Sequence, residues 1–222
     1  MPQIVVMGVS GCGKSSVGAA LATVLSGEFI DADDYHPQCN IDLMSRGTPL
    51  TDNDRVPWLH TLQRLLQAHS KNTPTHYLVV ACSALKRSYR ETLQTGAADT
   101  LFVHLHAPYS VIWDRLVARQ GHFAHSDILK SQYEALDLDH PTAATSTTNP
   151  TAARDGDGCV ATCTDRDEAC TDRKGACTDR DWACAGPGIN VYPVDVSTLQ
   201  VCEIVSDVGQ CLGQTYGVAI NG

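Results

Sequence analysis

The chain has 222 residues, of which 43% are hydrophobic and 18% charged, and its formal net charge is −9 at pH 7. These values predict one globular domain and exclude a disordered or fibrous chain. The negative charge disfavours non-specific binding to nucleic acid or to an anionic membrane. No apolar run approaches the roughly 18 residues of a membrane helix, and no secretory signal pattern is present, so we expect a cytoplasmic protein.

Short apolar runs alternate with helical patterns along the chain. The runs that predict strands lie at 4–7, 29–30, 77–81, 101–105 and 189–194. Apolar residues at helical spacing lie at 17–25, 57–66, 85–93, 111–116 and 202–212, with Pro57 placed at the first helical position. This alternation predicts an α/β fold whose sheet is mostly parallel, with ligands at the carboxyl ends of the strands.

A glycine-rich segment between the first expected strand and helix matches the phosphate-binding P-loop pattern. Its backbone N–H groups would point at phosphate oxygens, and the helix N-terminus adds a positive dipole end. Lys14 would neutralise the β- and γ-phosphates, and the Ser15 hydroxyl would bind Mg²⁺. The motif predicts a nucleoside triphosphate and Mg²⁺ as cofactors, with a nucleotide site formed by Gly8, Val9, Ser10, Gly11, Cys12, Gly13, Lys14, Ser15 and Ser16.

With this motif, the fold class becomes a P-loop NTPase-type three-layer fold. Its sheet has five mostly parallel strands, helices on both faces and a small lid. We expect residues 1–222 to form a single P-loop domain, with the lid at about 119–129.

Two acidic residues follow the second expected strand. Asp31 and Asp33 are two positions apart, so on a strand they would share one face. One carboxylate could hold Mg²⁺ while the other orients and deprotonates an acceptor hydroxyl, and the spacing does not say which. A solvated turn or a helix cap is the alternative interpretation.

Further polar residues lie where an acceptor or a lid is expected. Arg55 could offer a fork to a carboxylate, whereas a lone histidine such as His36 is more often a structural residue. Arg115 and Arg119 are four apart, on one helical face, and could clamp phosphates from the lid. A solvated charged face is the alternative for this pair.

Residues 143–188 break the α/β pattern because they hold few large apolar side chains. Cys-Thr-Asp-Arg recurs there from Cys163, Cys170 and Cys177, and Cys184 continues the spacing. This spacing lacks the CxxC pairs of a zinc site, so the segment is interpreted as a low-complexity insertion. Metal binding or redox cross-linking is the alternative.

Several motifs together resemble the gluconokinase family. They span about residues 3–138 and comprise the P-loop, DADDYHP at 31–37, PLxDxDRxPW at 49–58, CSALK at 82–86, GHF at 121–123 and SQYE at 131–134. The resemblance implies phosphorylation of D-gluconate by ATP at its 6-hydroxyl, giving 6-phosphogluconate for the pentose phosphate route. The cysteine-rich insertion departs from the family pattern.

The resemblance also implies residue roles. Lys14, Asp33 and Arg119 would be catalytic, with Asp33 as the base. Asp31 would be nearer the metal, which Ser15 would also bind. Arg115 would pack beside adenine. The acceptor would contact Asp33, His36, Arg55, Lys86 and His122.

Gluconate is the expected small-molecule partner, and we expect no binding to nucleic acid or to a membrane. Whether the protein forms a homodimer is left open. Two alternatives remain at this point: another kinase of the same fold, such as a shikimate kinase, or a non-catalytic nucleotide-binding interaction protein.

Overall fold

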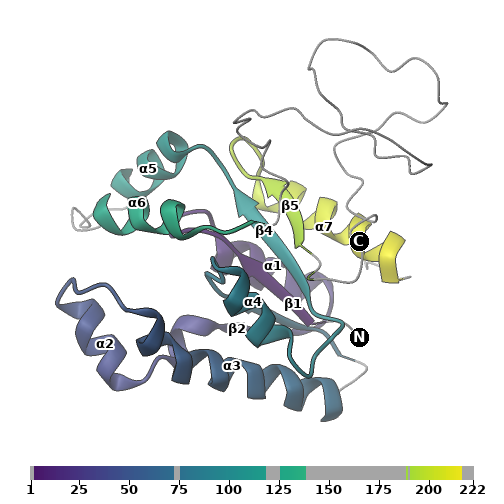
Figure 1. The fold of residues 1–222 in the computed structure, drawn as a ribbon. Helices are drawn as coiled ribbons and strands as arrows, with labels where there is room; N and C mark the ends of the chain where they lie inside the picture. Colours follow the sequence, from purple (N-terminus) through teal and green to yellow (C-terminus); the bar gives the residue numbers. More distant parts are fainter. Residues whose placement is uncertain (1–2, 73–75, 119–125, 139–188, 190, 217–222) are drawn as a thin grey trace, which may run out of the picture. The chain divides into compact units, whose positions relative to one another are not determined.

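The computed structural model describes residues 3–72, 76–118, 126–138, 189 and 191–216 (Figure 1). The strands are β1 (Gln3–Met7), β2 (Glu28–Asp31), β3 (Leu78–Ala81), β4 (Leu101–His106) and β5 (Val191–Asp195). The helices are α1 (Lys14–Val24), the 3₁₀ turn η1 (Ala32–Tyr35), α2 (Gln38–Ser45), α3 (Asp52–Asn72), α4 (Arg87–Gln94), α5 (Tyr109–Ala118), α6 (Ser126–Ala135) and α7 (Val201–Tyr216). The five predicted strands are all present, although β5 begins two residues later than expected.

The strands form one parallel sheet in the order β2-β3-β1-β4-β5. Val6 of β1 and Asp31 of β2 both pair with Ala81 of β3, so these three strands end at the same edge. The segments that leave this edge are the P-loop, η1 and the loop before α4. In parallel α/β sheets such an edge is where ligands bind.

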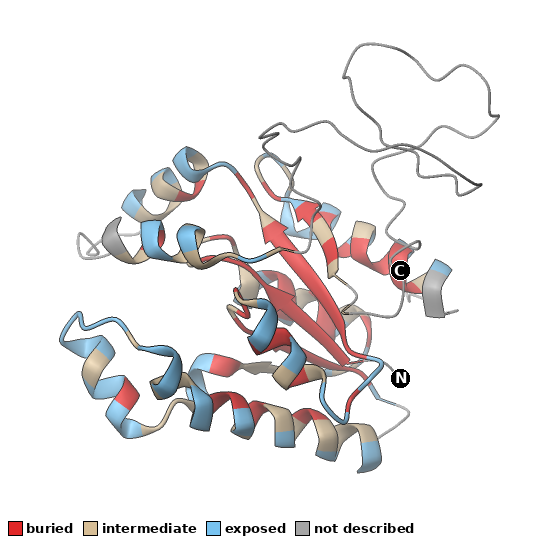
Figure 2. Ribbon diagram, viewed as in Figure 1, coloured by how far each residue is buried: buried red, intermediate tan, exposed pale blue. Residues whose placement is uncertain are grey.

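Helices cover both faces of the sheet. Phe29 faces α1, because a Cβ atom at Gly18 would lie 2.7 Å from the Phe29 ring. The next residue, Ile30, points to the opposite face, where it packs against the core that includes Trp58 and Leu62 of α3. Helix α7 packs beside α1, and α4 packs beside α3. Strands β1, β3 and β4 are almost entirely buried between these layers, whereas β2 and β5 are more exposed (Figure 2), and the arrangement confirms the three-layer α/β prediction.

The start of α3 differs from the prediction. The helix begins at Asp52, so Pro57 lies inside it and not at its first position. Thr51 and Asp54 form a reciprocal cap: the Thr51 hydroxyl and N–H donate to Asp54 Oδ2 at 2.6 and 2.7 Å, and Asp54 N–H donates to Thr51 Oγ1 at 3.3 Å. This capping box, visible in the sequence as Thr-x-x-Asp, fixes the start more strongly than the proline does.

Helix α2 was missing from the prediction. It is short, and its side chains are mostly exposed, so it lacks the apolar stripe that reveals a helix. Asn40 is the buried residue of α2, and its side-chain amide donates to the Asp54 carbonyl of α3 at 2.8 Å. One polar contact therefore ties α2 to the beginning of α3.

The chain divides into two units, residues 1–138 with 185–222 and residues 139–184. The insertion expected at 143–188 lies outside the described residues, as do 119–125 of the expected lid, whereas 126–129 begin α6. The single kinase domain, the lid and the insertion therefore stay predictions. Among the described residues, no helix combines the length and the apolar character needed to cross a membrane.

Candidate active site

The P-loop joins β1 to α1 through a backbone that requires glycine at two positions. Gly8 has a φ of 140°, and Gly13, which precedes α1, has a φ of 100°. A Cβ atom at Gly8 would lie 2.5 Å from the Leu105 carbonyl oxygen. Beside this turn is a cavity of about 220 Å³, lined by Gly11, Gly13, Lys14, Ser15 and Ser16. The first N–H groups of a helix lack partners within the helix, so this geometry suits an anion.

Lys14 and Ser15 supply the polar side chains of this cavity. The Lys14 ammonium donates to the Val9 carbonyl oxygen at 3.0 Å, which holds its charge over the loop. The Ser15 hydroxyl donates to Asp31 Oδ2 at 2.7 Å. A hydroxyl and a carboxylate, both oxygen donors, are the ligand types that Mg²⁺ takes alongside nucleotide phosphates. The described residues contain no cluster of three or more metal-ligating His, Cys, Asp or Glu side chains.

Asp31 and Asp33 lie close together, but not on one strand face as predicted. Strand β2 ends at Asp31, and the 3₁₀ turn η1 begins at the next residue. Asp31 caps this turn by accepting the Asp33 N–H at 3.1 Å and also accepts from the P-loop serine, whereas Asp33 lies within the turn. The acidic run of the sequence favours such a turn over continued extension.

The Asp33 carboxyl is set up to bind a proton more readily than an ordinary aspartate. Its side chain is 81% exposed by surface area. Partial desolvation nevertheless raises its pKa, and the charge of Asp31 raises that pKa further. Lys14 and His36 oppose this change.

His36 is held by two neighbours, Trp58 and Asn40, and offers one ring edge to Asp33. Its side chain is only 5% exposed, and its ring stacks on Trp58 at 4.3 Å between centroids. Trp58 is itself fixed by an indole N–H bond to the Ala32 carbonyl at 2.7 Å. The Asn40 amide donates to His36 Nδ1 at 3.3 Å, which leaves the proton on Nε2, and Nε2 lies 4.0 Å from Asp33 Oδ1. Burial lowers the His36 pKa, so the ring is neutral at pH 7.

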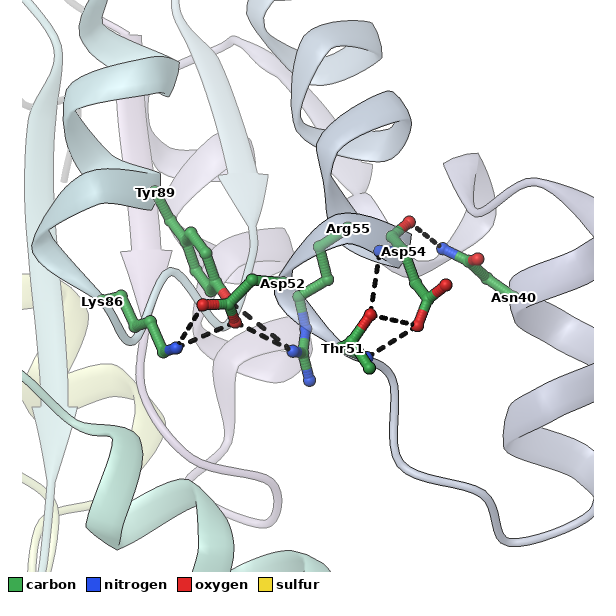
Figure 3. Close-up of polar contacts among 7 residues, drawn as sticks. All are labelled: Asn40, Thr51, Asp52, Asp54, Arg55, Lys86 and Tyr89. Carbon is green, nitrogen blue, oxygen red and sulfur yellow. Dashed lines mark hydrogen bonds and ion pairs between the residues drawn. The ribbon is translucent and has the colours of Figure 1, made fainter.

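Arg55 and Lys86 come together around Asp52, although they lie on α3 and before α4 (Figure 3). Lys86 Nζ lies 2.8 and 2.6 Å from the two Asp52 carboxylate oxygens. Tyr89 Oη donates to Asp52 Oδ1 at 2.5 Å, and Arg55 Nη1 lies 3.7 Å from the same oxygen. The charge of Arg55 also contributes to the lowered pKa of His36.

The loop that carries Lys86 has a constrained backbone. Ala84 has a φ of 41°, in the left-handed region that a residue with a Cβ seldom adopts. Arg90, whose side chain is fully buried, donates to the carbonyl oxygens of Ala84 and Leu85 at 3.1 and 3.0 Å and to that of Asp137. This guanidinium fixes the loop from within the protein.

The remaining predicted site residues are Arg115, Arg119 and His122, which were expected near the lid. Arg115 of α5 donates from Nη2 to the carbonyl oxygens of Val196 and Ser197, which places it beside the loop between β5 and α7. Arg119 and His122 lie outside the described residues. Their expected roles stay predictions.

Two polar residues of the site had no role assigned from the sequence. Gln132 of α6 accepts the Ser10 N–H at 2.7 Å and donates to the Ser10 hydroxyl at 3.1 Å, so α6 contacts the P-loop. Asp52 holds Lys86 and Tyr89. Both contacts join residues distant in sequence, and no local spacing reveals them; the only signal was that both residues fall within the motifs of the resemblance.

The chain is similar to several known proteins. A family model described as shikimate kinase matches residues 10–145. A probable gluconokinase from Xenopus tropicalis is 46% identical over 149 residues, which cover 60% of this chain and 77% of that protein. A thermosensitive gluconokinase from Escherichia coli is 45% identical over 135 residues, covering 61% and 71%. A crystal structure of a gluconokinase from Sinorhizobium meliloti matches with a TM-score of 0.66 and 34% identity, covering 96% of this chain and 92% of that one.

Proposed function

The chain belongs to the gluconokinase family of P-loop kinases, and from that premise we propose how its residues phosphorylate D-gluconate to 6-phospho-D-gluconate with ATP. The similarity to gluconokinases carries the choice of acceptor. The product would enter the pentose phosphate route, as in the family the sequence resembles.

The P-loop binds the triphosphate in this proposal. Its N–H groups and the Lys14 ammonium neutralise the phosphates, and Lys14 exchanges its contact with the Val9 carbonyl for a phosphate oxygen. Ser15 and Asp31, already joined at 2.7 Å, would hold Mg²⁺, which when bound draws negative charge from the phosphates. Arg115 would pack beside adenine.

Asp33 acts as the general base. As the 6-hydroxyl oxygen of gluconate bonds to the γ-phosphorus, the bond from that phosphorus to the β–γ bridging oxygen breaks and ADP leaves. The hydroxyl proton passes to the Asp33 carboxylate, whose raised pKa makes it a better acceptor than an ordinary aspartate. The Nε2 edge of His36 faces this carboxylate and steadies its anionic form.

The acceptor carboxylate binds at the cationic end of the site, formed by Arg55 and Lys86. An arginine fork matches a carboxylate in geometry as well as in charge. Arg119 and His122 would complete the site from the lid in the closed state. A cytoplasmic location belongs to the same proposal, which leaves a homodimer open.

A coupled assay of ADP release tests this function. We expect turnover with D-gluconate and none with shikimate or nucleoside monophosphates. Shikimate has to be included because the matching family model is described as shikimate kinase. Turnover with shikimate alone would replace the acceptor assignment, and no turnover with any acceptor would favour a nucleotide-binding protein without catalysis.

A further inference from the structure

Asp52 is an acidic residue at the cationic end of the acceptor site, and the proposed mechanism gives it no task. It is the first residue of α3, and its side chain is 58% exposed (Figure 3). The hydrogen bonds from Lys86 and Tyr89 lower its pKa, so it is ionised at neutral pH. Burial and the bond to Asp52 raise the Tyr89 pKa to about 12, which keeps the phenol a donor.

Asp52 engages the two neighbouring cations unequally. Both of its oxygens accept from Lys86, at 2.8 and 2.6 Å, which is the range of strong charge-assisted bonds. Arg55 lies 3.7 Å from Asp52 and 3.5 Å from the Tyr89 hydroxyl, distances at which hydrogen bonds are weak or absent. The Arg55 side chain is 30% exposed, so its guanidinium is open to another anion.

We infer that Asp52 sets the charge selectivity of the acceptor site by neutralising Lys86 and leaving Arg55 to bind a single carboxylate. Two cations and one fixed anion leave one net positive charge, which matches a monocarboxylic sugar acid. A second acceptor carboxylate at this end of the site would be repelled by Asp52. The inference rests on the proposed function, because it assumes that Arg55 faces the acceptor.

Two small acids that differ by one carboxylate test this selectivity. D-glycerate carries one carboxylate and tartronate two, on the same three-carbon frame, and both are measured as competitors of gluconate in the ADP-release assay. The measured quantity is the ratio of the inhibition constant of glycerate to that of tartronate. In Asp52→Asn we expect this ratio to increase about tenfold, because a negative charge that repels the second carboxylate is removed from the site. Asp52→Glu keeps the charge and should retain the wild-type ratio.

A double variant separates charge balance from a structural effect. Asp52→Asn with Lys86→Met restores one net positive charge, so the ratio should return toward the wild-type value. Asp54→Asn is the matched control, because it removes an equal charge from the same helical turn while its carboxylate contacts Thr51. The charge of Arg55 is the smallest influence on the Asp54 pKa, so we expect at most a small change of the ratio in this control.

The outcomes distinguish the inference from the proposed function. If the wild-type protein does not phosphorylate gluconate, the proposed function is wrong. If it does, but Asp52→Asn shows no gain in tartronate inhibition, or Asp54→Asn shows the same gain, the selectivity role of Asp52 is wrong. A double variant that keeps the full effect of Asp52→Asn would also contradict it.

Discussion

The two ends of the proposed active site, where phosphate and acceptor would bind, are built in different ways. The phosphate end is one continuous segment whose backbone N–H groups and consecutive side chains form the site. The acceptor end is assembled from η1, α3 and the loop before α4, and side chains make its contacts. The first depends on glycines and a helix start, whereas the second depends on the packing of distant elements. Substitutions at the two ends should therefore change different kinetic parameters of the enzyme.

The largest effect is expected at the phosphate end. Lys14→Ala removes the point charge that faces the transferring phosphate, and contributions of this kind are worth roughly 10³-fold or more in kcat. Steady-state kinetics should show that loss while thermal unfolding stays close to wild type. A variant with near wild-type kcat would remove Lys14 from the mechanism.

Asp33→Asn should reduce kcat by about 10²- to 10⁴-fold, because the base is lost while the shape is kept. A base must be deprotonated, so wild-type kcat/KM should fall as the pH decreases through the raised pKa of Asp33. The residual activity of the variant should lack this acidic limb, with ATP affinity little changed. A pH profile with the same limb in both proteins would assign the base to another group.

Arg55→Ala should act mainly on the acceptor. Loss of a charged hydrogen bond to the gluconate carboxylate predicts a rise of about tenfold to a hundredfold in the KM for gluconate. The KM for ATP should stay within a few-fold. Arg55→Lys should recover only part of the loss, because an ammonium cannot form the bidentate contact. Equal effects on both substrates would mean that the two ends are not separable.

The smallest effect is expected outside both ends. Replacing residues 143–188 by a short Gly/Ser linker should leave kcat and the KM for gluconate within a few-fold, since this segment has little apolar bulk to bury. Insoluble protein would contradict this prediction. So would a collapse of kcat that reducing agent and chelation of Zn²⁺ reproduce in the full chain. The cysteines from Cys163 to Cys184 would then be tested for a disulfide or a bound metal ion.

The same contrast explains which features could be predicted from the sequence. The P-loop, the parallel sheet and the closing helix follow from local patterns, because glycine spacing and apolar periodicity act within a few residues. Two predictions were wrong. Asp33 does not continue the strand, because Asp31 caps a 3₁₀ turn there, and α3 starts before Pro57, because Thr51 and Asp54 cap it earlier. The contacts of Asp52 and Gln132 depend on tertiary packing, so single-sequence reasoning did not find them.

The clamp that Arg90 places on the Ala84 loop has a consequence for binding entropy. Arg90 donates to the Ala84 and Leu85 carbonyl oxygens of this loop and is itself anchored on that of Asp137, which holds Ala84 in the left-handed region. The Lys86 backbone is thereby immobilised when the chain folds, and the acceptor does not have to order it. A small, flexible sugar acid makes few contacts that could compensate for the entropy cost of ordering the loop. The loop reaches that state through a guanidinium that the acceptor does not touch.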